Sequence, residues 1–152
     1  MNNNLDALLR RASKIAEHQF KKYGVIDAFW IVEKADGKQS IVVAPVMPES
    51  DSKRNEMLAG LSKAFRDLGV WRYACALESW VSSDTSCRPA QAPDRREVVV
   101  LIAEDGGATR GGMREIIRSS APPRRGRLVM SEAMGGRFTG LLNAARSGAT
   151  VQ

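Results

Sequence analysis

The chain has 152 residues, of which 43% are hydrophobic and 26% charged, and a formal net charge of +6 at pH 7. This composition excludes collagen-like, mucin-like and wholly disordered classes, because it supplies enough apolar material for a folded core. No apolar run approaches the roughly 18 residues of a membrane span, and residues 1–6 lack the pattern of a secretory signal. We therefore expect a cytoplasmic protein with one domain over residues 1–148 and a frayed tail over 149–152.

Two amphipathic helices are predicted in the first half of the chain. Over residues 5–23 the apolar positions recur with the i, i+3, i+4, i+7 rhythm of a helix, and Gly24 then follows as a stop signal. A second helix has Ser52 as its expected N-cap and Gly69 as its C-cap.

Strands are predicted between and after these helices. Residues 26–33 and 39–46 are rich in β-branched and aromatic side chains, and Asp36-Gly37 between them predicts a hairpin. Residues 71–81 alternate with the period of a strand. Residues 97–103 are apolar at successive positions, which is typical of a central strand that is buried on both faces.

The last third of the chain predicts shorter elements. Residues 82–95 form a connection, 110–118 are extended, 127–132 form a last strand, and 136–146 form a short closing helix. Because tight turns outnumber crossover helices, we expect an α+β fold: a two-layer domain whose largely antiparallel sheet has the helices packed on it. The predicted core includes Leu8, Ile15, Phe20, Leu61, Phe65, Val99, Leu101 and Leu141.

Residues that support common catalytic and metal chemistry are scarce. Cys75 and Cys87 are too few for a disulfide framework and do not have a zinc-binding spacing. His18 is the one histidine in the sequence, and helical periodicity places it with Arg11 and Lys22 on a solvated face. We therefore predict no catalytic residue, no metal ligand and no cofactor.

A glycine-rich stretch over residues 106–112 could present backbone amides to a phosphate. It lacks the Gly-Lys-Ser/Thr of a P-loop and the G-x-G-x-x-G pattern of a dinucleotide fold. A hairpin connection is the favoured interpretation.

Positive charge is concentrated at the carboxyl end. Residues 106–152 hold 8 arginines against 2 acidic residues, a balance of +6, and contain no lysine. Six of these eight are candidate binding residues: Arg110, Arg114, Arg118, Arg124, Arg125 and Arg127. The first three are spaced by four and share one face of a strand or a helix. They form either a surface for nucleic acid, another polyanion or a partner protein, or charges that protect an edge strand from sheet-to-sheet association. A high-GC genome would give the same arginine bias without any function.

A second candidate site lies on the strand predicted for residues 71–81. Glu78 shares a strand face with Trp80 and is expected to be partly buried there. It could belong to an acid–base site, or it could pair with Arg72 or Arg95. If Trp30 and Trp80 lie on an uncovered face with Glu78 and Arg95, they form a pocket or an interface.

The run Glu78-Ser79-Trp80, followed by Pro-Asp-Arg-Arg-Glu-Val-Val over residues 93–99, resembles a group of small uncharacterised bacterial and phage proteins. These have a Glu-Ala-Trp element and an Asp-Arg-x-Glu strand start. The resemblance covers about 20 residues, and Ser79 stands where that pattern has alanine. It implies a bacterial or phage context and no activity.

These observations favour a non-catalytic binding or regulatory module, with a protein as its partner. Two alternatives stay open: polyanion binding through the six arginines, and a small enzyme with a carboxylate site around Glu78 and Arg95. The sheet edges and the strand tryptophans also predict self-association as a two-fold dimer.

Overall fold

The structure, a computed structural model, describes residues 3–34, 40–117, 124–131 and 141–142. In chain order its elements are α1 (Asn3–Tyr23), β1 (Phe29–Lys34), β2 (Ser40–Val43), α2 (Asp51–Leu68), β3 (Val70–Val81), the short 3-10 helix η1 (Pro89–Gln91), β4 (Arg96–Asp105), β5 (Thr109–Ile117), β6 (Arg124–Arg125) and β7 (Val129–Ser131). The predicted tail at 149–152 lies outside the described residues.

Both long helices are confirmed. Helix α1 carries Asp6 in its first turn and lysines in its last, which complements the helix dipole. Helix α2 begins two residues earlier than predicted, because Ser50 and not Ser52 is its N-cap: the Ser50 hydroxyl accepts a hydrogen bond from the Lys53 N–H at 3.2 Å. It ends at Gly69, whose φ of 68° is the left-handed conformation that glycine adopts without a steric penalty.

The strands follow the predicted order. Strands β1 and β2 pair antiparallel, which confirms the hairpin, although its turn over residues 35–39 is outside the described residues. Strand β4 is central, between β3 and β5. Of the predicted closing helix over 136–146, Leu141 and Leu142 are described; both have helical backbone and are buried.

The sheet has the order β2-β1-β3-β4-β5-β6, and every pairing is antiparallel. Strand β5 is not an edge strand, since β7 pairs with residues 111–113 on its outer side and β6 pairs with Ile116 and Ile117. One end of the sheet is therefore covered by two short strands, and β2 lies at the other end.

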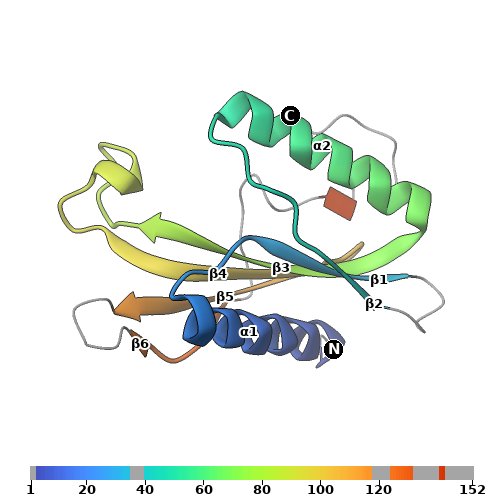
Figure 1. The fold of residues 1–152 in the computed structure, drawn as a ribbon, viewed down its shortest axis with the longest axis horizontal. Coiled ribbons are helices and arrows are strands. Elements are labelled where there is room, and N and C mark those ends of the chain that lie inside the picture. The colour runs from blue at the N-terminus through green and yellow to red at the C-terminus, as the bar shows by residue number, and fades with distance from the viewer. Residues whose placement is uncertain (1–2, 35–39, 118–123, 132–140, 143–152) are drawn as a thin grey trace.

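The helices lie on opposite faces of the sheet, α1 on one and α2 on the other (Figure 1). The α+β class with helices on an antiparallel sheet is confirmed, but the arrangement has three layers instead of the expected two. The reason is visible in β1: Phe29 and Ile31 pack toward α1, and Trp30 and Val32 pack toward α2. A strand that is apolar on both faces needs cover on both.

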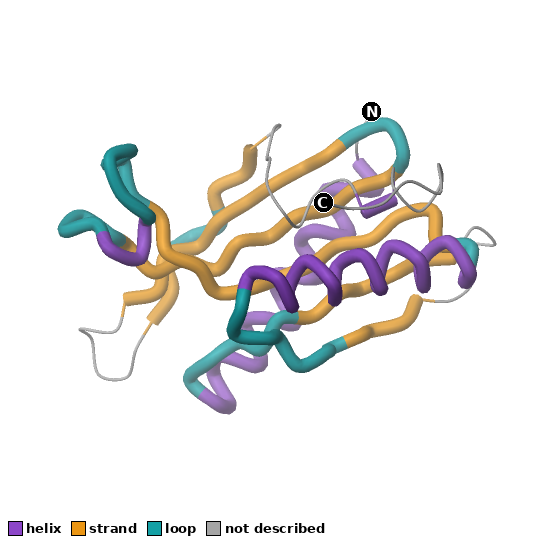
Figure 2. Tube along the Cα trace, turned by 90° about the horizontal axis from the view of Figure 1, so that it is seen from above, coloured by secondary structure: helices purple, strands orange, loops and turns teal. Residues whose placement is uncertain are grey.

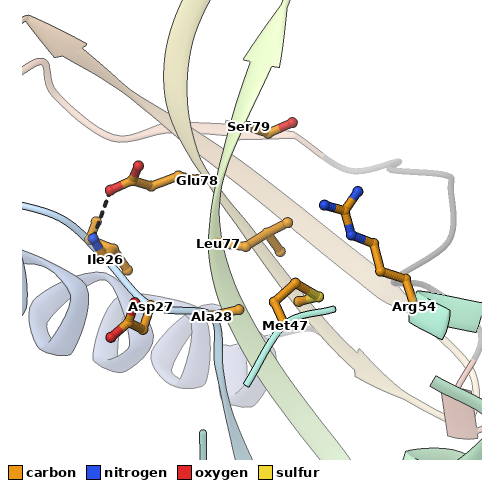
Figure 3. A pocket seen from close by; sticks show the side chains of 8 residues that line it. All are labelled: Ile26, Asp27, Ala28, Met47, Arg54, Leu77, Glu78 and Ser79. Carbon is orange, nitrogen blue, oxygen red and sulfur yellow. Dashed lines mark hydrogen bonds between the residues drawn. The ribbon is translucent and has the colours of Figure 1, made fainter. Parts of the chain in front are cut away.

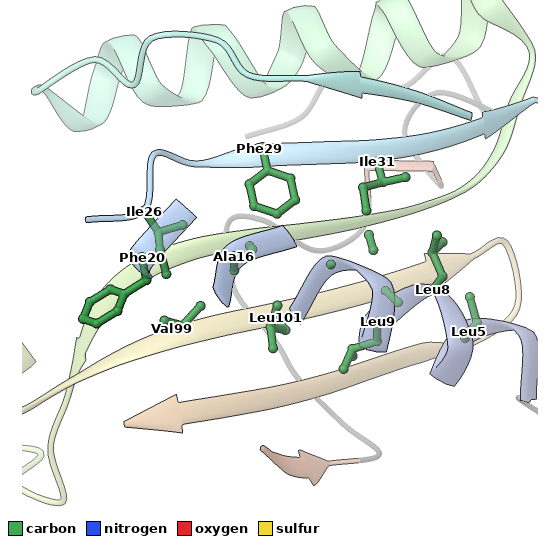
Figure 4. Packing of buried hydrophobic residues seen from close by; sticks show 14 of the residues in the cluster. Leu5, Leu8, Leu9, Ala16, Phe20, Ile26, Phe29, Ile31, Val99 and Leu101 are labelled. Atoms are coloured by element: carbon green, nitrogen blue, oxygen red, sulfur yellow. The ribbon is translucent and has the colours of Figure 1, made fainter. Parts of the chain in front are cut away.

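Two hydrophobic cores result, one for each face. The core under α1 joins Leu5, Leu8 and Leu9 to Val99 and Leu101 on β4 (Figure 4). The core under α2 joins Leu58 and Phe65 to Trp30 and Tyr73, with Leu141 and Leu142. All the predicted core residues lie in these clusters, with Ile15 and Leu61 at their partly buried margins. No helix among the described residues is long and apolar enough to cross a membrane.

The outer ends of β3 and β4, with the η1 loop that joins them, project beyond the end of α2 (Figure 1, Figure 2). Both helices leave this part of the sheet less covered than its centre. The candidate functional site lies at the base of this projection.

Candidate functional site

Strand β3 is longer than the neighbour that covers its outer edge. Strand β1 pairs with β3 from Lys34 opposite Val70 to Phe29 opposite Ala76. Strand β3 then continues to Val81, and its pairing with β4 continues for the whole distance. Residues 77–81 therefore have β4 on one side, and no described strand pairs with them on the other. We call this stretch the open edge of β3.

A hollow of about 330 Å³ lies beside the open edge, between the chain that enters β1 and the first residues of α2 (Figure 3). We call it the β3 hollow. Its lining residues are Ile26, Asp27, Ala28, Met47, Arg54, Leu77, Glu78 and Ser79.

Two neighbouring hollows share residues with the β3 hollow and extend it along the open edge. The first, of about 450 Å³, is lined by Asp51, Arg54, Ser79, Trp80, Arg88, Pro89 and Ala90. The second, of about 280 Å³, is lined by Glu78, Ser79, Trp80 and Glu97. The three hollows together follow β3 from Leu77 to Trp80.

Glu78 ties the segment before β1 to β3. Its Oε1 accepts a hydrogen bond from the Ile26 N–H at 2.7 Å across the gap that β1 leaves (Figure 3). A second carboxylate, Glu97, lines the neighbouring hollow on the same strand face. Arg72, one of the two arginines considered for Glu78, pairs with Glu33 on β1 at 2.7 Å instead.

The positively charged side chain of Arg54 lies at the mouth of the β3 hollow. Its Nε donates a hydrogen bond to the Pro48 carbonyl at 2.7 Å, which fixes the side chain beside the connection from β2 to α2. Its Nη1 lies 3.6 Å from an oxygen of Asp51, and Arg88 lies 3.8 Å from the other oxygen of the same carboxylate. Asp51 therefore joins α2 to the η1 loop.

The four residues predicted to form a pocket are brought together in part. Glu78 and Trp80 line the hollows, and the Arg95 guanidinium lies 5.3 Å from the centre of the Trp80 ring. Trp80 itself is 41% exposed. Trp30 does not join them, because it is fully buried in the core under α2. Neighbouring positions on a strand point to opposite faces, and this separates Trp30 from the face of Glu78.

Of the six arginines, three point toward α1 and contact its acidic side. Arg110 pairs with Asp6 at 2.7 Å, and Arg125 pairs with Glu17 at 2.7 Å. Arg114 lies 3.5 Å from Glu17 and also donates a hydrogen bond to the Gly126 carbonyl at 3.0 Å. These ion pairs hold the β5 end of the sheet to α1.

Of the other three arginines, one has a described side chain. Arg127 is exposed. Arg124 pairs through its backbone with Ile117, and its side chain is outside the description, as is Arg118 altogether. Four of the six arginine side chains are therefore described, and three of these four have partners on α1.

Glu17 receives two of these arginines. Partial burial alone would raise the pKa of its carboxyl, but the positive charges of Arg125, Arg114 and Lys21 outweigh that effect and lower the pKa below its usual value of 4.5. Glu17 is therefore ionised in the fold at neutral pH.

The glycine-rich stretch begins with a turn whose backbone N–H groups already have a carboxylate partner within the chain. The carboxylate of Asp105 accepts hydrogen bonds from the N–H groups of Gly107 and Ala108 at 2.8 and 2.9 Å. Gly111 and Gly112 are buried in β5. This is the hairpin connection that was favoured over a phosphate cradle.

Sequence reasoning missed Met47 and Arg54 as lining residues, since neither lies in a motif and both reach the hollow through the tertiary fold. In the described part of the chain, no three His, Cys, Asp or Glu side chains are grouped so that they could hold a metal ion. His18 is exposed, as predicted.

No protein family model, curated protein or solved structure matches this chain.

Proposed function

We propose that this chain is a non-catalytic binding module that takes a short extended segment of a partner protein along the open edge of β3. The observation that carries the proposal is the mismatch between β1 and β3: residues 77–81 run past their neighbour, and the β3 hollow lies beside them. An extended peptide that joins a sheet edge gains affinity from main-chain hydrogen bonds and specificity from pockets for alternate side chains.

The lining indicates which segment fits. Leu77 and Met47 offer apolar surface for one medium-sized aliphatic side chain. Arg54 at the mouth complements a carbonyl or carboxylate two positions further along the segment, since alternate residues of a strand share a face. Trp80 is exposed enough to pack against the other side chains of the bound segment, and tryptophan is a frequent anchor at protein interfaces.

Two observations favour this function over the alternatives. The Glu78 carboxylate already holds the Ile26 backbone, which is a structural task and supports binding over acid–base catalysis. Arg110, Arg114 and Arg125 are engaged with α1, which supports a structural task for them over polyanion binding.

The test is peptide selection on the purified protein from a random library of unstructured ten-residue peptides. Enriched peptides are then measured by titration, with tryptophan fluorescence as one readout. We expect a consensus with one aliphatic position and micromolar affinity, and at least a tenfold loss of affinity in Trp80→Ala and in Arg54→Ala.

Leu68→Ala is the matched control, because Leu68 is as exposed as Trp80 but lies at the far end of α2. It should leave the affinity unchanged. Selection without a consensus, or equal affinity for the native protein, Trp80→Ala and Arg54→Ala, would contradict the proposal. Binding of DNA, RNA or heparin in place of peptide, with a steep salt dependence, would favour the polyanion alternative.

A further inference from the structure

The edge of the sheet opposite β6 and β7 is formed by β2. Strand β2 is the last in the strand order, and no described strand pairs with its outer side. Ile41 and Val42 at its centre are 37% and 50% exposed. They point to opposite faces, since Ile41 is opposite Val32 on the α2 side and Val42 is opposite Ile31 on the α1 side. Helix α1 contacts this strand at its first residue, where the Arg11 guanidinium donates a hydrogen bond to the Ser40 hydroxyl at 2.9 Å, but Ile41 and Val42 stay exposed.

Strand β2 is short, with four residues, but it lacks the other usual protections against pairing. Besides short length, natural edge strands are guarded by charged side chains, by proline or by a covering segment. Residues 40–47 include no charged residue, and the proline at position 45 lies beyond the end of β2. The opposite end of the same sheet is guarded, because β6 and β7 cover β5. Among the described residues, no strand pairs with the outer backbone donors and acceptors of β2, and these lie beside apolar side chains.

We propose that β2 pairs antiparallel with β2 of a second copy of this chain, about a two-fold axis normal to the sheet. The absence of charge on β2 favours a second copy as the partner. Strand β2 has no charged side chain, so its own copy brings uncharged side chains opposite it and no like-charge repulsion. The axis brings the α1 faces of both copies to the same side of a continuous sheet.

Symmetry also fixes which residues meet. When the axis is normal to the sheet, opposed residues must share a face, so a central residue faces its own counterpart. Val42, which is more exposed than Ile41, faces Val42 of the second copy, and Ile41 faces Val43. This dimer leaves the open edge of β3 accessible, because β1 separates β2 from β3.

The physical character of the interface follows from its composition. A single strand pair is small beside the roughly 1,200–2,000 Å² of a stable interface, so we expect dissociation in the micromolar range. Since no ion pair is involved, the affinity should change little between low and high salt.

Sedimentation equilibrium of the full chain over about 1–200 µM is the first test. We expect the mass to rise from 16.6 kDa toward twice that value. Val42→Lys should stay monomeric, because two lysines would face each other across the axis. The matched control is Val46→Lys, which adds the same charge at a 92% exposed site beyond the strand and should still dimerise.

Cross-linking tests the register with two variants that each add one cysteine to a Cys87→Ser background; the remaining native thiol, Cys75, is buried. Opposed residues have their Cα atoms about 4.5–5.5 Å apart, which a disulfide spans. Val42→Cys should therefore form a covalent dimer under mild oxidation. In Ile41→Cys the two positions are diagonal neighbours about 7–8 Å apart, and cross-linking should be slow.

A native protein that stays monomeric at every concentration would overturn the proposal. So would a dimer that Val42→Lys and Val46→Lys affect equally, or equal cross-linking of Val42→Cys and Ile41→Cys. Circular dichroism of each variant confirms that it is folded before its mass is interpreted.

Discussion

Arg125 and Glu17 lie 108 residues apart in the chain and meet in a 2.7 Å ion pair between Nη2 and Oε1. The Arg125 guanidinium also donates a hydrogen bond to the Glu17 carbonyl at 3.1 Å, and it lies 5.2 Å from the centre of the Phe20 ring. With its side chain 10% exposed, Arg125 anchors β6 to α1. Arg114 reaches the same carboxylate from β5.

Glu17→Gln should therefore destabilise the fold. The substitution removes the charge that two nearly buried arginines face, and we expect a loss of about 1–2 kcal/mol in the free energy of unfolding at pH 7, between the values for exposed and buried pairs. Urea unfolding followed by circular dichroism measures it. Glu56→Gln on the exposed side of α2 is the control, and a loss there of equal size would contradict the assignment.

The same pair predicts a pH dependence. Because the pKa of Glu17 is lower in the fold than its usual 4.5, its stabilising contribution is fully present above pH 4.5. That contribution is lost as the pH falls through the lower folded value. The difference in stability between the native protein and Glu17→Gln should thus be constant from about pH 6 to 8 and shrink below about pH 4. A difference that stays constant down to pH 3 would argue against an ionised Glu17.

Leu101→Ala tests the central position of β4. Leu101 is fully buried under α1, and truncation of such a residue costs about 2–5 kcal/mol. Leu68→Ala, at an exposed leucine, should cost less than about 1 kcal/mol. Equal losses for the two variants would mean that β4 is not central.

Gly112 marks a close approach of β5 to its neighbours. A Cβ atom there would lie 3.0 Å from the Leu128 side chain and 3.3 Å from the Val129 carbonyl oxygen. We expect Gly112→Ala to lower the melting temperature, with a loss of about 1–3 kcal/mol from overpacking. Gly60→Ala is the opposite case: it lies in α2 with open space around it and should stabilise the fold by up to about 1 kcal/mol.

The two cysteines should differ in reactivity. Burial, reinforced by the nearby negative charge of Glu104, raises the pKa of the Cys75 thiol, whereas Cys87 is partly exposed. One equivalent of a thiol reagent should be consumed quickly by the native protein at pH 8, and the second upon unfolding. The Cys87→Ser variant should lose the fast equivalent; if it keeps it, Cys75 is accessible.

The positions of the helices and strands follow from the sequence because their signals are local. Apolar periodicity, a serine before a helix and Gly69 after one all act within a few residues, and so α1, α2 and β4 were predicted almost at their observed places. The wrong prediction of Ser52 as the N-cap of α2 also has a local cause, because Ser50 and Ser52 are both plausible caps. Ser50 is the cap because its backbone is extended and its side chain accepts the Lys53 N–H.

The layers and the binding edges were decided by the tertiary structure. Strand patterns show that both faces of β1 are apolar, but not which helix covers which face. Arg110 and Arg125 have the same local signature whether they bind a polyanion or hold α1, because their partners lie more than 100 residues away in sequence. The open edge of β3 exists since β1 starts at Phe29 while β3 continues to Val81, and a difference in length between neighbouring strands is a property of their pairing, which no single segment encodes.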